Sequence, residues 1–436
     1  MLDEVAVRTL GRAAASHLGA DRVVIGRDTR ESGPLLARAL AEGLVAGGLE
    51  VTSLGVVPTP AVAHECRVDG VAGAVVSASH NPWFDNGIKL FAAGGHKLDD
   101  RVQSAIQETW DACPRLEEPT LVPDWADPVD PTAGGRRWAD ALIAGVVAGS
   151  TGEQGGDQPL NGCSLVVDCA NGATSSFAVD VLRRLGAQVG VLHASPNGRN
   201  INESCGSTHP GDLRVAVVDA GADAGLAFDG DGDRVVAVGD DGALLDGDDL
   251  LAVCGVDLHD RGLLTGDTVA ITVMSNLGLR RALDDHGISV YETPVGDRHV
   301  LEALEANGWV LGGEQSGHVI FRSVATTGDG LLTGIHALIA AGRAGRTLGG
   351  RVADLVIRAP QVLQAVPVAA DGVDVVNALA DEIAEAGAEL GSAGRVLVRP
   401  SGTEPVVRVM VEAFDAAEAA AVADRLVDAV RRVDRT

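Results

Sequence analysis

The chain has 436 residues, of which 46% are hydrophobic and 22% charged, so we expect two to four globular domains of roughly 100–200 residues each. Its formal net charge of −27 disfavours binding to nucleic acid or anionic lipid, and no run of about 18 apolar residues indicates a membrane span. The six cysteines form no CxxC pair, which favours a reducing, cytoplasmic location over a disulfide framework or a zinc site. A surface with this net negative charge also repels phosphorylated metabolites. Any phosphate site must therefore be a local cationic pocket.

Short apolar strands alternate with amphipathic helices along most of the chain. Strands are predicted at residues 23–26, 72–77, 165–168 and 269–273, and helices at 34–46, 178–185 and 277–283. This alternation predicts an α/β fold with mixed or parallel sheets.

Changes in composition indicate where the domains end. Residues 148–162 are rich in Gly, Ser and Gln and form the best linker candidate, and further boundaries are expected near 246–249 and 356–367. The remaining pattern predicts a small α+β domain, with a helix at 372–390, strands at 395–398 and 406–412, and a helix at 416–433.

A polar loop with the sequence SASHNPWFDNGIK, residues 77–89, follows one predicted strand. Ser79 then lies at the carboxyl end of a strand, where open α/β sheets bind ligands. A serine needs a base or a charge to become a nucleophile; His80 is adjacent, and Lys89 comes within reach if the turn signals between them curl the loop. Spacing alone leaves an ordinary polar turn as an equal alternative.

A second loop carries Asp229, Asp231 and Asp233 at alternate positions, separated by glycines. Three convergent carboxylates favour Mg²⁺ or Ca²⁺ over zinc. An EF-hand is excluded, because its sixth and twelfth positions would be Arg234 and Asp240 instead of Gly and Glu. A solvated acidic turn is the remaining alternative.

A third loop, residues 312–318, reads GGEQSGH and offers Glu314, Ser316 and His318 to the hydroxyls of a sugar. On its own, this pattern is more typical of a tight polar turn.

A fourth loop, residues 399–405, reads RPSGTEP and lies between two predicted strands. The guanidinium of Arg399, the hydroxyls of Ser401 and Thr403, and backbone N–H groups around Gly402 could cradle a phosphate. This is the cationic pocket that the net charge requires, although a structural hairpin loop is the alternative.

Taken in this order, the four loops resemble the α-D-phosphohexomutase superfamily over nearly the whole chain. The resemblance implies three similar mixed-sheet α/β domains and a smaller C-terminal α+β domain around a central cleft. The domains are expected at residues 1–147, 160–247, 248–360 and 364–436. Each would contribute one loop to the cleft, for phosphoserine, metal, sugar and phosphate in turn.

The resemblance also assigns roles to residues. It implies a catalytic group of Ser79, His80, Lys89 and Arg234. It implies Mg²⁺ bound by Ser79, Asp229, Asp231 and Asp233. It implies substrate contacts from Asp297, Arg298, Glu314, Ser316, His318, Arg399, Ser401, Gly402 and Thr403.

Within the superfamily, several segments resemble the phosphoglucosamine mutases. They are GEQSGH, and residues 202–210, 274–278, 295–298 and 326–330. The implied reaction interconverts glucosamine 6-phosphate and glucosamine 1-phosphate through a phosphoserine and a 1,6-bisphosphate, which would also act as an activator. It would supply UDP-N-acetylglucosamine and cell-wall precursors.

Other functions remain open from the sequence. They are a phosphomannomutase or phosphoglucomutase, a phosphatase that forms a phosphoserine, and a sugar-phosphate sensor without catalysis. The expected partner is a small hexosamine phosphate, not nucleic acid or membrane, and a homodimer stays an open alternative.

One departure from the superfamily concerns the N-terminal end. Its members normally open with a strand and a GTDGxRG loop that brings an Arg to the cleft, whereas this sequence starts with MLDE and a predicted helix. We therefore expect weak mutase activity and an exposed apolar edge in the first domain. A misplaced start codon and a degraded paralogue are the two explanations, and the intact loops favour the first.

Overall fold

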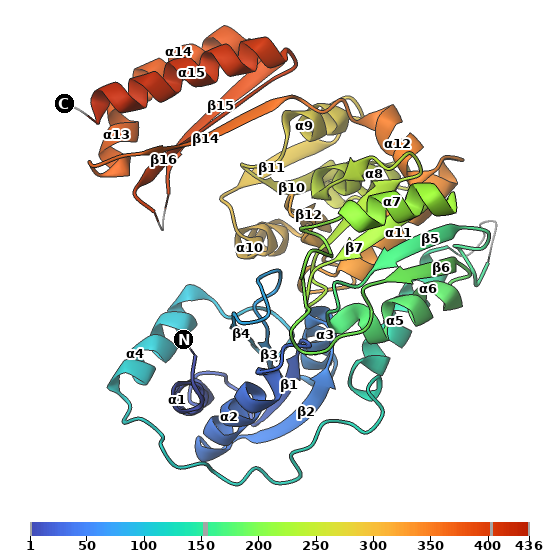
Figure 1. The fold of residues 1–436 in the computed structure, drawn as a ribbon, viewed down its shortest axis with the longest axis vertical. Helices are drawn as coiled ribbons and strands as arrows, with labels where there is room; N and C mark the ends of the chain where they lie inside the picture. Colours follow the sequence, from blue (N-terminus) through green and yellow to red (C-terminus); the bar gives the residue numbers. More distant parts are fainter. Residues whose placement is uncertain (1, 151–155, 402–403, 435–436) are drawn as a thin grey trace. The chain divides into compact units, whose positions relative to one another are not determined.

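The computed structural model describes residues 2–150, 156–401 and 404–434 (Figure 1). Its contacts define two compact units. The N-terminal unit comprises Met1–Val273 and Ile288–Asp354, and the C-terminal unit comprises Met274–Gly287 and Leu355–Thr436. Among the described residues, no helix is both long enough and apolar enough to cross a membrane.

The first sheet has the strand order β2-β1-β3-β4. Its strands are β1 (Arg22–Arg27), β2 (Glu50–Val56), β3 (Ala72–Val76) and β4 (Ile88–Phe91). The accompanying helices are α1 (Glu4–Ala15), α2 (Gly33–Ala46), α3 (Thr59–Asp69), α4 (Asp100–Ala112), η1 (Ala133–Gly135) and α5 (Arg136–Gly149). Strand β1 pairs in parallel with β2 and β3, whereas β4 runs antiparallel to β3.

The second sheet has the order β6-β5-β7-β8-β9. Its strands are β5 (Ser164–Asp168), β6 (Gln188–Leu192), β7 (Ala224–Phe228), β8 (Val235–Gly239) and β9 (Leu244–Leu245). Its helices are η2 (Ala173–Ser176), α6 (Ala178–Arg184) and α7 (Gly211–Ala220). Strand β5 is parallel to β6 and β7, and β8 returns antiparallel to β7.

The third sheet has the order β11-β10-β12-β13. Its strands are β10 (Thr268–Thr272), β11 (Ser289–Thr293), β12 (Leu311–Gly313) and β13 (Val319–Phe321). The helices of this part of the N-terminal unit are α8 (Gly247–Asp260), η3 (Thr265–Asp267), α10 (Asp297–Asn307), α11 (Gly330–Arg343) and α12 (Leu348–Leu355). Strand β10 is parallel to β11 and β12, and β13 is antiparallel to β12.

The three sheets therefore share one topology, which confirms the predicted trio of mixed-sheet α/β domains. In each sheet, the third strand of the domain (β3, β7 or β12) is buried at every residue and is followed by an antiparallel fourth strand. The loop between these two strands starts from a fixed point in the core. These loops carry Ser79, the three aspartates and Glu314.

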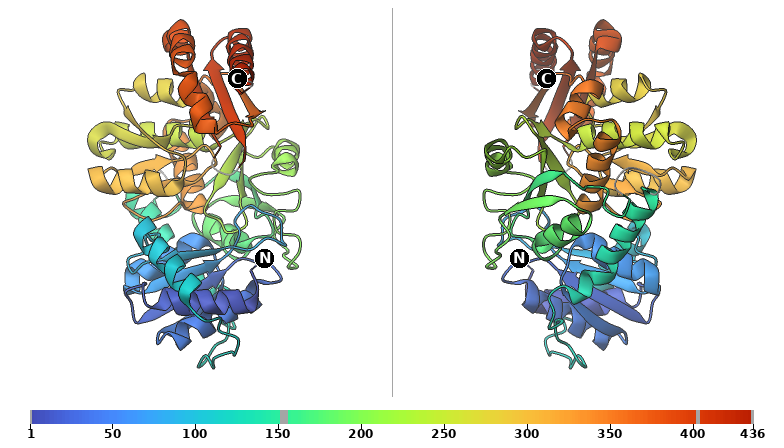
Figure 2. Two further views of the ribbon diagram at one scale, coloured as in Figure 1. Left: turned by 90° about the vertical axis from the view of Figure 1, so that its left-hand side faces the viewer. Right: turned by 90° about the vertical axis from the view of Figure 1, so that its right-hand side faces the viewer.

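The C-terminal unit contains an antiparallel sheet with the order β14-β16-β15. Its elements are α9 (Leu277–Asp284), β14 (Gln361–Pro367), α13 (Gly372–Ala378), α14 (Ala380–Leu390), η4 (Gly391–Ala393), β15 (Gly394–Pro400), β16 (Val406–Ala413) and α15 (Ala416–Val433). Figure 2 shows the helices α13, α14 and α15 beside this sheet.

The single helix predicted for 372–390 is wrong, because the chain breaks it at Leu379. The backbone of Leu379 has φ −102° and ψ 7°, outside the helical region, and its side chain packs into the hydrophobic core of this unit. The break therefore lies at a residue whose side chain is buried in the core of this unit.

Glu412 ties α9 to the sheet of the C-terminal unit. Its side chain is fully buried and accepts hydrogen bonds from Asn276 Nδ2 at 3.1 Å, from Leu277 N at 2.9 Å and from Gln361 Nε2 at 2.6 Å. Arg395 Nε completes the set at 2.6 Å and supplies the compensating charge. A carboxylate can be buried in this way only because each partner is present.

We expect Glu412→Ala to destabilise the C-terminal unit by about 3 kcal/mol, since it removes the buried carboxylate that accepts from Asn276, Leu277, Gln361 and the partly buried Arg395. Hydrogen exchange read by mass spectrometry should show faster exchange in peptides from α9 and β14. Glu404→Ala is the matched control, because Glu404 is exposed, and its cost should stay within about 0.5 kcal/mol. Equal exchange in the two variants would contradict this prediction.

Candidate active site

The loop between β7 and β8 holds three carboxylates that are removed from solvent. Asp229 and Asp231 are 0% exposed and Asp233 is 2% exposed. One oxygen from each carboxylate lies within 4.8 Å of the others, which is a spacing that a single metal ion can bridge. The glycines between them permit the tight curl: Gly232 has φ +71°, and a Cβ at Gly230 would lie 2.6 Å from the carbonyl oxygen of Ser79.

Lys89 on β4 is the main neutralising group at this loop. Its Nζ donates to Asp231 Oδ2 at 2.6 Å and to Asp233 Oδ2 at 2.8 Å. Burial lowers the pKa of Lys89, but Asp231, Asp233 and Asp229 outweigh that effect and hold the pKa above its ordinary value. The lysine is therefore cationic at neutral pH.

The carboxylates of the acidic loop differ in their pKa shifts, and two of their oxygens lack hydrogen-bond partners among the described residues. Burial and the neighbouring Asp233 and Asp231 raise the pKa of Asp229 well above its usual value. Burial also acts to raise the pKa of Asp233, yet Lys89 and His318 bring it well below its usual value. Asp231 Oδ1 and Asp233 Oδ1 are buried oxygens without a hydrogen-bond partner among the described residues. Orphaned carboxylate oxygens of this kind fit a hard divalent cation such as Mg²⁺.

Ser79 faces this acidic loop from the first domain. Its Oγ donates to Asp229 Oδ2 at 2.5 Å, and its backbone adopts φ +52°, which is uncommon for a residue with a side chain. Ser77 Oγ accepts from the Ser79 N–H at 2.9 Å and donates to Asp28 Oδ2 at 2.6 Å. The serine is thus held in a strained backbone conformation that directs its hydroxyl at a prospective metal ligand.

Arg30 is the organiser of the Ser79 loop, and the sequence reasoning missed it. Its side chain is almost completely buried and pairs with Asp28 through Nε at 2.8 Å. The guanidinium donates to the backbone carbonyls of Ser79 at 3.1 Å and Asn81 at 2.8 Å. It also donates to those of Pro82 and, at 3.0 Å, Asp85. The available signal was a charged pair directly after the buried strand β1, at the sheet edge where ligands bind.

Two further positioning groups come from other segments. Asn202 Nδ2 donates to the Ser79 carbonyl at 2.8 Å and to the Asn81 carbonyl at 3.0 Å. Thr59 donates through its hydroxyl to Asp231 Oδ2 and through its N–H to the Asp231 carbonyl at 2.8 Å. Asn202 was noted in the sequence only as part of a subfamily segment, and nothing in the sequence singled out Thr59.

His80 and Arg234 lie beside the serine. His80 Nδ1 is 3.5 Å from Ser79 Oγ and 3.2 Å from Arg234 Nη1. Burial and then the Arg234 guanidinium lower the pKa of His80. Burial opposes the charge on Arg234, but Asp233 and Asp229 raise the pKa of its guanidinium. All four predicted catalytic residues are therefore brought together around the acidic loop.

The third loop reaches the same region through His318. This residue is buried, its Nε2 accepts from the Gly328 N–H at 3.0 Å, and its Nδ1 lies 3.7 Å from Asp233 Oδ1. Glu314 accepts from Gly296 N at 3.0 Å and from Ser316 Oγ at 3.2 Å. The sugar-loop residues form one connected group.

Asp297 and Arg298 behave differently from one another. Asp297 lies 3.4 Å from His318 Nε2 and pairs with Lys97. Burial raises the pKa of Asp297, but His318 and Lys97 together lower it to about 2. The Arg298 guanidinium instead pairs with Asp100 and, at 2.8 Å, with Glu302, so its charge is already engaged.

In the C-terminal unit, Arg399 and Arg408 are direct partners across β15 and β16. Burial and the neighbouring Arg408 lower the pKa of Arg399, which shows two cations crowded on one face. Arg399 Nη2 lies 3.9 Å from Met274 Sδ, and Ser401 N donates to the Val406 carbonyl at 2.9 Å. The predicted contacts Gly402 and Thr403 lie outside the described residues.

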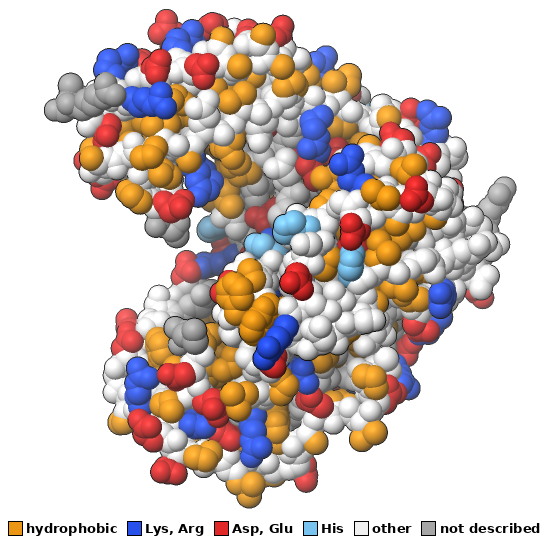
Figure 3. All heavy atoms as spheres, viewed as in Figure 1, with side chains coloured by type: hydrophobic (Ala, Val, Ile, Leu, Met, Phe, Trp, Pro, Cys, Tyr) orange, Lys and Arg blue, Asp and Glu red, His pale blue; other side chains and the backbone are white. Residues whose placement is uncertain are grey.

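Figure 3 shows acidic and basic side chains interspersed over the drawn face, so the net negative charge is not gathered into one patch there. Among the described residues of this site, the carboxylates are most concentrated in the buried loop after β7. Electrostatic selection of a ligand therefore depends on local groups more than on the surface as a whole.

Comparison with known proteins places these loops in context. Family models of the phosphoglucomutase/phosphomannomutase domains match residues 1–114 (domain I), 153–242 (domain II), 246–358 (domain III) and 363–429 (C-terminal domain). A phosphoglucosamine mutase of Frankia casuarinae is 50% identical and covers 95% of this chain and 89% of its own length. One from Thermobifida fusca is 48% identical, with 94% and 89% covered.

Solved structures show the same fold. A phosphoglucomutase/phosphomannomutase family protein from Burkholderia thailandensis superposes with a TM-score of 0.82 at 26% identity, covering 99% of this chain and 94% of that chain. An Aspergillus fumigatus N-acetylphosphoglucosamine mutase, solved with GlcNAc-6P and magnesium, gives 0.65 at 19% identity, with 95% and 77% covered. At this lower identity the likeness concerns the fold alone.

The orphaned oxygens of the acidic loop predict that Asp231→Asn weakens binding of a divalent cation at least about tenfold, or about 1.4 kcal/mol. The substitution keeps the side-chain shape and removes one anionic ligand. Asp241→Asn is the matched control, because it removes the same charge from an exposed turn of the same domain. Calorimetric titration with Mg²⁺ or Mn²⁺ measures both; equal affinities for the two variants would refute the assignment of the site.

Proposed function

The chain belongs to the phosphoglucomutase/phosphomannomutase family, and from this premise we propose that it is a phosphoglucosamine mutase. It would interconvert glucosamine 6-phosphate and glucosamine 1-phosphate through a phosphoserine at Ser79. The observation that carries the proposal is the 2.5 Å contact of Ser79 Oγ with Asp229 inside a loop of three buried carboxylates. The 46–50% identity to phosphoglucosamine mutases supports the choice of sugar.

Mg²⁺ is the cation that fits the acidic loop best. The donors are oxygens alone, two of them are buried without hydrogen bonds, and three protein carboxylates leave room for phosphate oxygens. When bound there, Mg²⁺ would offset the charge on the phosphoryl oxygens during transfer. Asp229, Asp231 and Asp233 would hold it, with an oxygen on Ser79 as the further ligand.

The residues around Ser79 suit phosphoryl transfer. In the forward direction, the phosphoryl group leaves Ser79 Oγ for a hydroxyl of the sugar phosphate, whose proton passes to a nearby base. The bisphosphate then reorients in the site, and its other phosphoryl group is transferred to Ser79 Oγ. Lys89 and Arg234 supply positive charge to the transferring group, and His80, 3.5 Å from Ser79 Oγ, is the nearest imidazole for the proton.

The remaining substrate contacts extend this proposal. Glu314, Ser316 and His318 would bind sugar hydroxyls, with Asp297 beside His318. Arg399 and Ser401 would bind the phosphate that is not reacting, and the crowding of Arg399 against Arg408 favours an anion there. Because each phosphate of the bisphosphate must occupy both positions in turn, one cradle serves both half-reactions.

A phosphomannomutase or phosphoglucomutase is the alternative within the family, and a phosphatase the alternative outside it. A panel of glucosamine, mannose and glucose 6-phosphates with Mg²⁺ separates the sugars, and we expect glucosamine 6-phosphate to give the highest kcat/KM. Stimulation by a trace of hexose 1,6-bisphosphate separates a mutase from a phosphatase, because only a mutase needs it to restore phosphoserine. Preference for another sugar would overturn the sugar assignment, and net release of phosphate would overturn the mutase.

Ser79→Ala should abolish turnover while leaving the affinity for sugar phosphate largely unchanged, since the substitution removes only the acceptor oxygen. Kinetics and calorimetric binding on the same preparation measure the two effects. Ser16→Ala, at the C-terminal end of α1, is a control that should leave both unchanged. Retained turnover in Ser79→Ala would disprove the phosphoserine mechanism.

Arg30→Lys should lower kcat on the order of 10²-fold with little change in KM, because one ammonium cannot replace the planar guanidinium that fixes several loop carbonyls. Misplacement of Ser79 affects transfer more than binding of sugar phosphate. Arg27→Lys is the matched control, since Arg27 precedes the same turn but pairs with Asp127 at 2.5 Å. A parallel loss in both variants would show that Arg30 has no special positioning role.

A further inference from the structure

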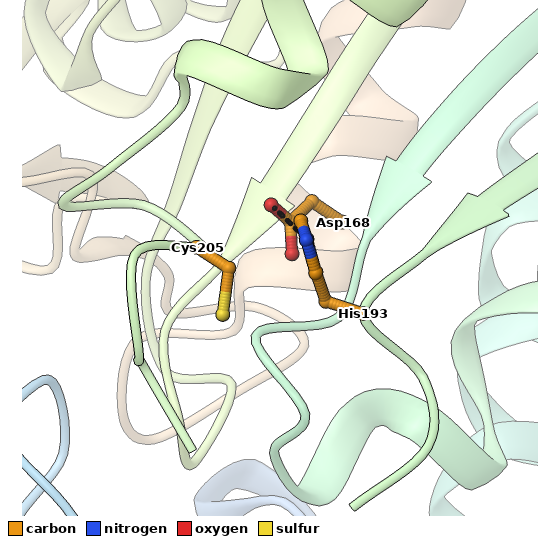
Figure 4. A group of neighbouring side chains, drawn as sticks. All are labelled: Asp168, His193 and Cys205. Atoms are coloured by element: carbon orange, nitrogen blue, oxygen red, sulfur yellow. Dashed lines mark ion pairs between the residues drawn. The ribbon is translucent and has the colours of Figure 1, made fainter. Parts of the chain in front are cut away.

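A cluster of Asp168, His193 and Cys205 lies in the second domain, separate from the acidic loop (Figure 4). Asp168 ends β5, His193 follows β6, and Cys205 lies in the loop before α7. One ligand atom from each residue lies within 4.8 Å of the others. We propose that these three side chains bind a second metal ion, Zn²⁺, that holds this loop in place.

His193 and Asp168 form a close contact that is not an aligned hydrogen bond. His193 Nδ1 lies 3.0 Å from Asp168 Oδ2, yet it is buried and makes no aligned hydrogen bond with a described residue. Zinc bonds of about 2.0–2.2 Å at tetrahedral angles place a nitrogen and an oxygen ligand roughly 3.4 Å apart, so this pair would have to open by only about 0.4 Å to bind the ion. Figure 4 shows the imidazole and the carboxylate turned toward one another, with Cys205 beside them.

Other contacts orient the ligands. His193 Nε2 lies 3.4 Å from Asp212 Oδ2, so a carboxylate stands behind the ring and favours a proton on Nε2, which leaves the Nδ1 lone pair free. Asp168 is held by the N–H groups of Ala170 and Gly206, each at 2.9 Å. His193 itself adopts φ +47°, which is rare for a residue with a side chain.

Cys205 distinguishes a metal site from a catalytic triad. A Cys–His–Asp group could form a nucleophile, but Cys205 is 0% exposed, which keeps its thiol out of reach of a substrate. Metal binding instead replaces the thiol proton: Zn²⁺ forms a bond to Sγ, and the proton leaves to solvent. Asn171 Nδ2, 3.9 Å from Sγ, faces the resulting charge.

The donor set selects the ion. Sulfur, imidazole nitrogen and carboxylate oxygen suit Zn²⁺ and disfavour Mg²⁺, which takes oxygen ligands. The thiolate and the carboxylate together balance the double positive charge. The His193 side chain is 26% exposed, so a water molecule can complete the coordination from the solvent side.

The zinc site would also limit the movement of a segment that positions Ser79. Asn202, which donates to the carbonyls of Ser79 and Asn81, lies between His193 and Cys205 in the chain, and its N–H donates to Ala170 O at 2.9 Å. An ion that fixes both ends of this segment limits the positions open to Asn202. The expected role is therefore structural, with an indirect effect on the placement of Ser79.

The experiment uses the full chain after chelation and transfer into excess Mg²⁺. One equivalent of Co²⁺ should give a sulfur-to-cobalt charge-transfer band in the near ultraviolet, and Zn²⁺ should displace it. The acidic loop has no sulfur and so gives no such band, and the loss of the band in a Cys205 variant distinguishes the new site from the other free cysteines. Cys205→Ser should lose the band, and Zn²⁺ should raise the melting temperature of the parent but not of this variant.

Cys254→Ser is the matched control, because Cys254 is a buried thiol in α8 outside the cluster, and it should keep the band. His193→Gln, at a partly exposed position, tests the site again should Cys205→Ser fail to fold, and it should weaken Co²⁺ binding at least tenfold. Absence of the band in the parent, or an unchanged band in Cys205→Ser or unchanged affinity in His193→Gln, would overturn the proposal. Bisphosphate-dependent activity with Mg²⁺ alone would leave the mutase assignment standing in that case.

Discussion

The burial of three carboxylates on one short loop is the constraint on which the site depends. Burial and mutual repulsion disfavour the ionisation of all three carboxylates unless cations lie beside them. Lys89 enters from β4 of the first domain, and Arg234 follows the loop itself. When all three carboxylates are ionised, these two cations leave one negative charge, and two of the carboxylate oxygens have no hydrogen bond to a described residue. The arrangement is therefore most stable with a divalent cation present.

The repeated topology explains how distant segments meet this constraint. The loops β3–β4, β7–β8 and β12–β13 occupy the same place in three similar sheets, each between a buried third strand and its antiparallel partner. One supersecondary pattern thus supplies Ser79, the three buried aspartates and Glu314. Changes of sequence in the loops alter the chemistry without disturbing the strands that anchor them.

Alternation of strand and helix patterns predicted the α/β class, and glycine-spaced aspartates predicted the acidic loop. Residues with a local sequence pattern, such as Asp229 and Ser79, could be found in this way. Arg30 and Asn202 were missed, because their role is to bind backbone carbonyls, which every residue has. For Arg30 the sequence offered the charged pair after β1 as a signal, but it did not reveal the carbonyls that Arg30 binds. The cluster of Asp168, His193 and Cys205 was hidden for a related reason: its ligands come from the ends of two strands and from a loop, and they lack the close spacing that indicates zinc.

The hydrogen bonds around Ser79 suit a side chain that carries a phosphoryl group in the proposed reaction. Its carbonyl is bound by Arg30 and Asn202, and its N–H by Ser77, so the backbone carries the positional restraint. The hydroxyl contacts only Asp229 and His80 among its described hydrogen-bond partners. In the proposed reaction, a fixed main chain with Oγ facing only Asp229 and His80 would let the side chain gain and lose a phosphoryl group without a change in the loop. The hydrogen bonds to the N–H and carbonyl of Ser79 stabilise its left-handed backbone conformation.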